Sequence, residues 1–259
     1  MIWSEEGGAG SRTVLLVHGV GATAAVWKNV ARALGERGDV RWVAADLGGH
    51  GGSEWQPLYS VGQLAAQLAE LVRESRELYV VGHSLGAYVG LALASGWFGI
   101  EVRGVLGIGP KIVWPDADLR AARELACRPV RWYPTAEEAW ARYRRVAGLS
   151  ADIAPGEELL ARGIAGETGW RLAQDPRTFA VAGAPFASLA ASARARVLLA
   201  RGANDPMVTL EELRTHASQA HDIPGVGHNA HIEEPRAVLA LFDQLMAGTW
   251  APPSPGSVT

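Results

Sequence analysis

Residues 78–86 read Leu-Tyr-Val-Val-Gly-His-Ser-Leu-Gly and are the most informative stretch of the chain. The apolar, β-branched run 78–82 predicts a buried strand, and residues 85–94 predict a helix. Ser84 therefore lies where a strand turns into a helix. A Gly-x-Ser-x-Gly pattern at such a turn strains the serine backbone and projects its hydroxyl from the carboxyl end of a sheet. Ser84 is a candidate nucleophile; an ordinary serine at a strand–helix junction is the alternative.

Short apolar strands alternate with amphipathic helices on both sides of this stretch. The apolar runs at 13–17, 40–45, 102–108 and 196–200 predict further strands, and the apolar stripe of 61–72 has helical spacing. Continuous apolar strands separated by amphipathic helices are typical of a parallel sheet covered on both faces. The predicted fold class is therefore α/β.

A region of different character separates the two halves of this pattern. It looks helical, lacks strand signals, and is interpreted as an insertion over the sheet. The predicted division of the chain is an α/β core of residues 1–110 and 190–248, a helical lid (cap) of residues 111–189, and a flexible, proline-rich tail of residues 249–259.

A serine hydroxyl is a weak nucleophile until a base takes its proton. His228 is the candidate base because it lies in a glycine-containing loop directly before the last predicted helix. His231, three residues further on, is its local rival. Asp205 directly follows a predicted strand and is the candidate carboxylate that orients the base, with Asp222 ranked second. The sequence thus predicts a triad of Ser84, Asp205 and His228.

The tetrahedral intermediate of acyl transfer needs hydrogen-bond donors aimed at its oxyanion. The backbone N–H of Leu85 follows the candidate nucleophile at a helix start. The second donor is expected in the loop after the first predicted strand, where we select the N–H of Val20. These two groups form the predicted oxyanion hole.

With these residues identified, the chain resembles the α/β-hydrolase superfamily, in its lidded serine hydrolase branch of esterases, C–C bond hydrolases and cofactor-free haloperoxidases. His18-Gly19 resembles the family's oxyanion motif, and residues 46–53 resemble its Asp-x-x-Gly-His-Gly-x-Ser loop. Residues 82–86 match its nucleophile elbow, and the order serine, acid, histidine is also the family's. The resemblance covers roughly residues 12–110 and 195–247.

The resemblance implies a mostly parallel sheet of about seven strands flanked by helices, with a helical lid inserted after the sixth family strand. Only 12 residues precede Thr13, so the family's usual opening hairpin is shortened and seven strands or fewer are expected. The lid of this family selects the substrate, and residues 111–189 match no motif that identifies one.

Candidate substrate-binding residues are Gly19 and His83 near the candidate nucleophile, and three tryptophans of the lid: Trp114, Trp132 and Trp140. Packing within the lid is the alternative for each tryptophan. The lid contains ten arginines and ten acidic residues, with one further cation in Lys111. It therefore has no excess of positive charge that would favour binding of an anion. Its local cluster of Arg142, Arg144 and Arg145 is interpreted as a solvated helix face.

The leading hypothesis is a serine hydrolase that cleaves a carboxylic ester, thioester or lactone of a small-to-medium apolar substrate through an acyl-enzyme. A C–C bond hydrolase, or a cofactor-free haloperoxidase or lyase, is the second hypothesis. A C–C bond hydrolase needs polar lid groups to hold a carboxylate or enolate, and the lid arginines leave this open. A non-catalytic ligand receptor on the same scaffold is the third.

Composition excludes several other classes. Twenty-four basic and 27 acidic residues give a net charge of −3, which offers no reason to expect a nucleic-acid or membrane partner. The single Cys127 excludes an internal disulfide, and no metal-ligand spacing appears, so no metal or cofactor is expected. No apolar run approaches the ~20 residues of a membrane helix, and no secretory signal is visible. We expect a cytoplasmic monomer or homodimer that acts on a small molecule.

Overall fold

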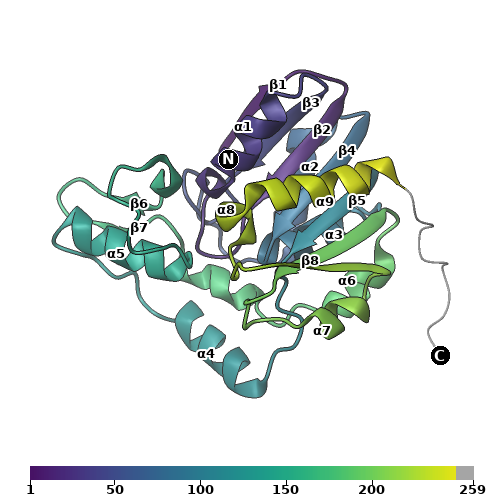
Figure 1. The fold of residues 1–259 in the computed structure, drawn as a ribbon. Coiled ribbons are helices and arrows are strands. Elements are labelled where there is room, and N and C mark those ends of the chain that lie inside the picture. Colours follow the sequence, from purple (N-terminus) through teal and green to yellow (C-terminus); the bar gives the residue numbers. More distant parts are fainter. Residues whose placement is uncertain (249–259) are drawn as a thin grey trace.

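The computed structural model describes residues 1–248, and the predicted tail of residues 249–259 lies outside this range. Seven strands form one sheet in the order β1-β3-β2-β4-β5-β8-β9 (Figure 1). β1 runs antiparallel to β3, and all other neighbouring strands are parallel, as predicted. The strands are β1 (Ser4–Gly8), β2 (Arg12–Val17), β3 (Val40–Ala45), β4 (Glu77–His83), β5 (Val102–Ile108), β8 (Arg196–Gly202) and β9 (Gln219–Ile223).

Helices cover both faces of this sheet because successive strand side chains point to opposite sides. In β2, Leu16 packs into one apolar layer with the helices α1 and α9. Leu15 packs into the other layer with α2 and α3. The helices of this part are α1 (Lys28–Gly35), α2 (Val61–Val72), α3 (Leu85–Leu93), α6 (Phe186–Ser192), α7 (Leu210–Arg214), α8 (Ala230–Glu233) and α9 (Pro235–Ala247). Within residues 1–248, none of the helices is long and apolar enough to cross a membrane.

The strand β1 has no apolar alternation, since its sequence is Ser-Glu-Glu-Gly-Gly. The sequence analysis did not predict it. It forms because the backbone of an edge strand can pair with β3 without burying a side-chain face. With β1 included, the sheet has the expected seven strands.

The chain between β5 and β8 stands beside the sheet rather than extending it (Figure 1). Its elements before α6 are α4 (Asp116–Ala126), α5 (Ala136–Val146), a 3₁₀ turn at Glu158–Leu160, β6 (Ile164–Ala165), β7 (Arg171–Leu172) and a 3₁₀ turn at Pro176–Val181. The prediction that this region lacks strands is wrong. β6 and β7 form a two-residue antiparallel ladder, and Tyr133 and Trp170 add an isolated bridge. Such short pairings leave no period-two pattern in a sequence.

A buried carboxylate fastens this insertion to the sheet. Asp46 directly follows β3, and its side chain is fully buried. It accepts hydrogen bonds from the N–H groups of Ala24 and Gly52 and from Arg162 Nε, at 2.7, 2.8 and 2.8 Å. The guanidinium of Arg162 also lies 3.3 Å from the ring centroid of Trp3. One carboxylate therefore joins the turn after β2, the loop after β3 and the insertion, and Arg162 extends the contact to Trp3 in the N-terminal segment.

Replacing Arg162 with methionine should lower the free energy of unfolding by about 3 kcal/mol, because Asp46 would keep a buried charge without its cation. We expect the lower end of the usual range because the Arg162 side chain is 25% exposed. Urea unfolding at 25 °C measures the change. The control, Arg103→Met, breaks an exposed pair with Glu101 and should cost about 1 kcal/mol or less. Equal losses of unfolding free energy in the two variants would contradict the stabilising role of the contact between Arg162 and Asp46.

Candidate functional site

Ser84 occupies a strained turn between β4 and α3. Its φ of 50° and ψ of −112° make it one of two non-glycine residues with positive φ in residues 1–248. Such a conformation costs of order 1–3 kcal/mol and persists only where the surroundings impose it. A hydrogen bond of 2.8 Å from the Ser84 N–H to the Ile108 carbonyl holds the turn.

Two glycines make this turn possible. A Cβ at Gly82 would lie 2.2 Å from the Gly86 carbonyl oxygen, and a Cβ at Gly86 would lie 2.1 Å from the Val17 carbonyl oxygen. Backbone therefore contacts backbone where β4, α3 and β2 meet, and no side chain fits there. The Gly-x-Ser-x-Gly pattern is explained by this packing.

The candidate base and acid are hydrogen-bonded to each other. His228 Nδ1 donates to Asp205 Oδ2 at 2.8 Å, and the Asp205 side chain is fully buried. Asp205 Oδ1 accepts the N–H of Met207 at 2.8 Å, which fixes the carboxylate from its other side. The hydrogen bond from His228 Nδ1 to Asp205 places the ring proton on Nδ1, which leaves His228 Nε2 free to accept a proton.

The loops after β8 and β9, which carry Asp205 and His228, meet at Gly202. A Cβ there would lie 2.0 Å from the Gly227 carbonyl oxygen. The end of β5 connects this pair to Ser84. Ile108 accepts the Ser84 N–H, while the next residue, Gly109, packs on Asp205 and His228. A Cβ at Gly109 would lie 3.1 Å from Asp205 Oδ2 and 3.2 Å from His228 Nδ1. All three predicted triad residues therefore lie together at the carboxyl edge of the sheet.

The two rival residues lie elsewhere. His231 is 1% exposed, and the centroid of its ring lies 4.5 Å from the ring centroid of Trp27 and 4.3 Å from that of His83. Burial lowers the pKa of His231 to about 3. Asp222 pairs with Arg201 at 3.0 Å. Neither rival takes part in the hydrogen bond between Asp205 and His228.

The loop that carries Val20 is held by two neutral histidines. His18 Nε2 accepts the Leu47 N–H at 2.9 Å, and His50 Nε2 accepts the Gly21 N–H at 3.1 Å. Burial lowers the pKa of both rings, that of His50 to about 3, so both remain neutral acceptors. These bonds join the loop after β2 to the loop after β3 and fix the backbone around Val20.

The N–H groups of Val20 and Leu85 are free to act as donors. Among the backbone and side-chain hydrogen bonds of residues 1–248, neither group donates to a protein acceptor. Both residues line one cavity together with Ser84. Fixed donors that face a cavity beside a serine can stabilise negative charge developing on a substrate oxygen.

This cavity, called the Ser84 cavity below, has a volume of about 310 Å³ and mostly apolar walls. Its two charged residues, Lys111 and Asp118, form an ion pair with each other. Its lining residues are Val20, Ser84, Leu85, Tyr88, Lys111, Trp114, Asp118, Ala121, Ala122, Leu125, Phe179, Val181, Ala182, Gly183 and Met207. Most of this wall comes from the insertion, so the cavity lies between the insertion and the sheet edge.

Of the predicted substrate-binding residues, only Trp114 lines the Ser84 cavity. Gly19 is absent from the wall and packs against His83 and Ser84, because a Cβ there would lie 2.9 Å from His83 Nδ1 and 3.1 Å from Ser84 Cβ. His83 is buried, and its Nε2 donates to the His228 carbonyl at 3.0 Å. Trp132 is 60% exposed, and Trp140 packs on Tyr143 with ring centroids 5.9 Å apart. The two tryptophans lie outside the cavity wall.

Sequence reasoning missed several residues of this wall. Tyr88 lies one helical turn after Ser84, and this spacing on α3 could have indicated it. Phe179, in the 3₁₀ turn at Pro176–Val181, and Met207, in the loop after β8, carry no comparable signal, because the tertiary fold alone brings them to the cavity. Within residues 1–248, no three His, Cys, Asp or Glu side chains gather as they would around a metal ion.

Comparison with known protein families identifies the family of this chain. A model described as the alpha/beta hydrolase family matches residues 14–241. This chain belongs to the alpha/beta hydrolase family. It is an enzyme of the hydrolase class, as the sequence resemblance predicted. No curated protein sequence matches the hydrolase.

Solved structures share the fold of this hydrolase. A thioesterase domain from the curacin biosynthetic pathway is 24% identical, with 93% of this chain and 94% of that chain covered and a TM-score of 0.72. An esterase of M. tuberculosis is 24% identical, with coverages of 95% and 89% and a TM-score of 0.73. An E-2-(acetamidomethylene)succinate hydrolase is 21% identical, with 94% of both chains covered and a TM-score of 0.74. At these identities the likeness shows the fold.

Replacing Gly86 with alanine should lower the free energy of unfolding of the hydrolase by about 3 kcal/mol, because the new methyl group would overlap the Val17 carbonyl. Gly62 in α2 is the matched control, since a Cβ there meets no atom within 4 Å. Gly62→Ala should raise the free energy by about 0.5–1 kcal/mol. Urea unfolding compares the two variants. An unchanged free energy of unfolding in Gly86→Ala would contradict the close approach of Gly86 to the Val17 carbonyl.

The buried histidines should make the hydrolase sensitive to acid. The folded-state pKa of His231, about 3, is below its ordinary value of 6.5. Between these values the unfolded chain binds a proton that the folded chain excludes, so stability is full above pH 6.5 and falls as the pH drops. His231→Phe keeps a ring against Trp27 and should reduce the slope of this loss by about 1.4 kcal/mol per pH unit. Urea unfolding between pH 7.5 and 4.5 measures the slope of the unfolding free energy against pH. An unchanged slope in His231→Phe would refute the assignment of this acid sensitivity to His231.

Proposed function

We propose that the protein is a serine hydrolase that cleaves a carboxylic ester, thioester or lactone through a triad of Ser84, His228 and Asp205. The observation that carries the proposal is the 2.8 Å hydrogen bond from His228 to the buried Asp205, next to the strained Ser84 turn. A serine, a base and a carboxylate in this relation form an activated nucleophile.

In the first half-reaction, Ser84 Oγ attacks the carbonyl carbon while His228 Nε2 takes the hydroxyl proton. The carbonyl π electrons move to its oxygen, which accepts hydrogen bonds from the N–H groups of Val20 and Leu85. Asp205 stabilises the imidazolium of His228. When the tetrahedral intermediate collapses, the bond to the leaving group breaks, and the leaving alcohol or thiol takes the proton from His228.

In the second half-reaction, water attacks the acyl-enzyme and gives one proton to His228. The bond from the acyl carbon to Ser84 Oγ breaks, and the serine recovers its proton from His228. The products are a carboxylic acid and an alcohol or thiol, which are joined in one molecule when the substrate is a lactone. The cycle consumes one water and needs no other reactant.

The shape and lining of the Ser84 cavity support a small-to-medium apolar substrate. Its volume of about 310 Å³ is at the lower end of the usual range for ligand pockets. The ion pair of Lys111 with Asp118 leaves the wall without net charge. We propose that residues 111–189 act as a lid, because they supply Trp114, Leu125 and Phe179 to this wall. The similarity to esterase and thioesterase structures agrees with this reaction class.

The test is covalent labelling with a fluorophosphonate, followed by intact-mass measurement and peptide mapping. We expect one adduct on Ser84, formed with loss of fluoride, and its loss in Ser84→Ala and His228→Ala. Hydrolysis of p-nitrophenyl butanoate should fall by about 10⁴-fold or more in Ser84→Ala. Asp205→Asn should cost about 10⁴-fold in kcat because it leaves His228 in the wrong tautomer.

Ser188→Ala is the matched control, since Ser188 is an exposed serine of α6 outside the cavity. It should keep both the adduct and the turnover of the unaltered protein. Full turnover in folded Ser84→Ala would overturn the proposal, as would an adduct confined to another residue.

A further inference from the structure

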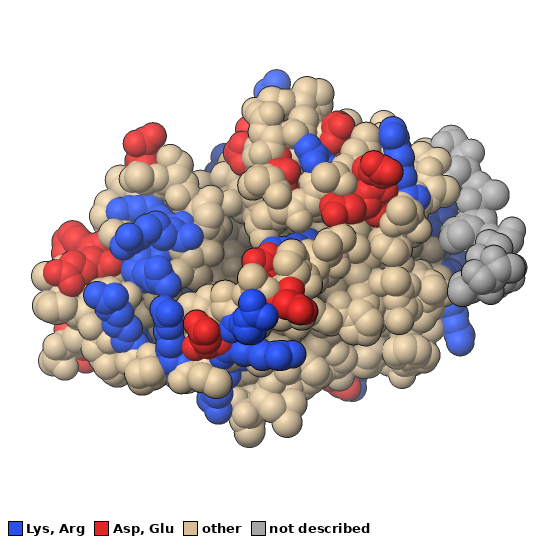
Figure 2. Space-filling view, turned by 90° about the horizontal axis from the view of Figure 1, so that it is seen from below, with Lys and Arg blue, Asp and Glu red and all other residues tan. Residues whose placement is uncertain are grey.

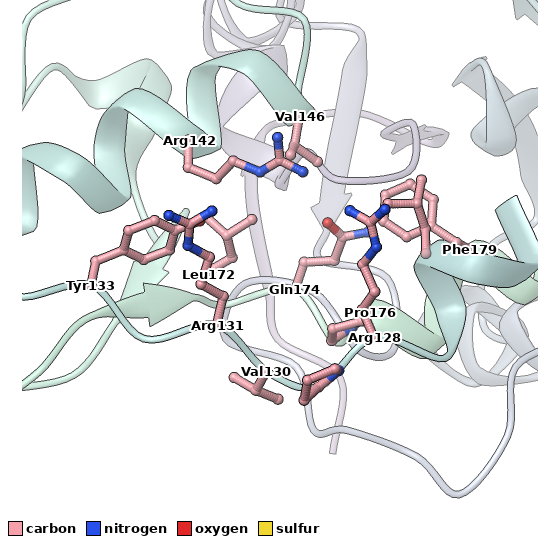
Figure 3. A pocket seen from close by; sticks show the side chains of 12 residues that line it. Arg128, Val130, Arg131, Tyr133, Arg142, Val146, Leu172, Gln174, Pro176 and Phe179 are labelled. Atoms are coloured by element: carbon pink, nitrogen blue, oxygen red, sulfur yellow. The ribbon is translucent and has the colours of Figure 1, made fainter. Parts of the chain in front are cut away.

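A second cavity, lined by three arginines, lies in the insertion. Its volume is about 180 Å³, and we call it the arginine cavity. Its lining residues are Leu125, Arg128, Pro129, Val130, Arg131, Tyr133, Arg142, Val146, Leu172, Gln174, Pro176 and Phe179. Figure 3 shows the guanidinium groups of Arg128, Arg131 and Arg142 turned toward the same space from two sides, with Arg142 on the helix and the other two on the segment opposite.

The three arginines share this space without a carboxylate. No Asp or Glu is among the residues that line the cavity. Among the ion pairs within residues 1–248, none includes Arg128, Arg131 or Arg142. Three like charges around one small space repel each other, and an anion in that space would remove the repulsion. In Figure 2, Lys and Arg side chains gather along the lobe on the left of the view.

The near balance of eleven basic and ten acidic residues in the insertion conceals this local excess. Two acids of the insertion pair with other cations: Asp118 binds Lys111, and Asp175 binds Arg177. The interpretation of Arg142 as part of a solvated helix face is also corrected, because Arg142 is half-buried and lines the cavity. On the same helix, Arg145 is exposed and its Nε donates to the Ala141 carbonyl at 3.3 Å.

The arginine cavity adjoins the proposed active site. Leu125 and Phe179 line both this cavity and the Ser84 cavity, so one wall of two side chains separates them. Val146, also in the wall of the arginine cavity, packs against the loop of the proposed oxyanion hole. A Cβ at Gly21 would lie 2.5 Å from Val146 Cγ1. The two cavities are therefore direct neighbours that share part of their lining.

We propose that Arg128, Arg131 and Arg142 form an anion-binding subsite, and that the substrate carries a carboxylate or phosphate at the end remote from the bond that is cleaved. This inference rests on the proposed function. The apolar part of the substrate fills the Ser84 cavity, and its anionic end lies between the guanidinium groups. Guanidinium forks bind carboxylate and phosphate oxygens in pairs. The Arg131 guanidinium stacks 5.0 Å from the Tyr133 ring centroid, which limits its rotation.

The kinetic test compares butanoyl thioesters that differ only in the charge of the thiol part. The neutral reference is S-butanoyl-N-acetylcysteamine, and the anionic substrates are S-butanoyl-3-mercaptopropanoate and S-butanoyl-2-mercaptoethyl phosphate. S-glutaryl-N-acetylcysteamine carries the carboxylate on the acyl side instead. We expect an anionic substrate to have a higher kcat/KM than the neutral one, and the preferred position of the anion identifies which part of the substrate faces the arginines.

The triple variant Arg128→Gln, Arg131→Gln and Arg142→Gln should lower kcat/KM for the preferred anionic substrate by about 10- to 100-fold. Its kcat/KM for the neutral thioester should stay within about twofold. Arg145→Gln, the control on the same helix as Arg142, should change neither value. An equal fall for both substrates, or no fall for any anionic one, would overturn the subsite. High salt should reduce the advantage of the anionic substrates.

A binding measurement separates this subsite from the hydrolase activity. Ser84→Ala protein is titrated calorimetrically with hexyl phosphate, hexanoate and hexanol, with and without the three glutamine substitutions. We expect an anion to bind more tightly than hexanol only when the arginines are present, even if no thioester is turned over. Equal binding in both proteins would refute the subsite, whereas fluorophosphonate labelling of Ser84 in the triple variant reports separately on the proposed nucleophile.

Discussion

The backbones of β4, α3 and β2 meet at a point where no side chain fits, and the arrangement of the site depends on this contact. Gly82 and Gly86 let carbonyl groups approach to distances that a Cβ would block. The chain leaves β4 and enters α3 through a residue with positive φ, which is Ser84. The strain at one residue is thus maintained by the packing of three elements, each buried in the core.

Parallel pairing explains why residues far apart in the sequence meet beside this turn. Because β4, β5, β8 and β9 run in the same direction, the loops that follow them emerge at one edge. The glycines at the ends of β5 and β8 then allow these loops to touch. The loop after β2 reaches the same edge, where it is held by backbone N–H groups that donate to two buried neutral histidines.

The insertion depends on this edge and completes it. Arg162 binds Asp46, and Tyr59 donates to Asp175 at 2.8 Å, so two separate contacts hold the insertion on the loops near β3. The insertion in turn supplies most of the wall of the Ser84 cavity and all of the arginine cavity. An apolar space and a cationic space, separated by two side chains, suit a substrate with an apolar body and a charged end.

The sequence by itself determined the class of fold, the family, and the order of the candidate serine, acid and histidine along the chain. These features depend on short apolar strands, amphipathic helices and glycine-flanked motifs, which are local patterns. It also predicted Ser84, Asp205 and His228 as a set, and their catalytic roles remain a prediction. The tertiary structure alone decided that Trp114 lines the cavity while Trp132 and Trp140 do not. It also decided that Arg142 faces a cavity, and that Phe179 separates two cavities. These properties depend on which surfaces of an irregular insertion meet the sheet edge, and such long-range contacts leave no periodic pattern in the sequence.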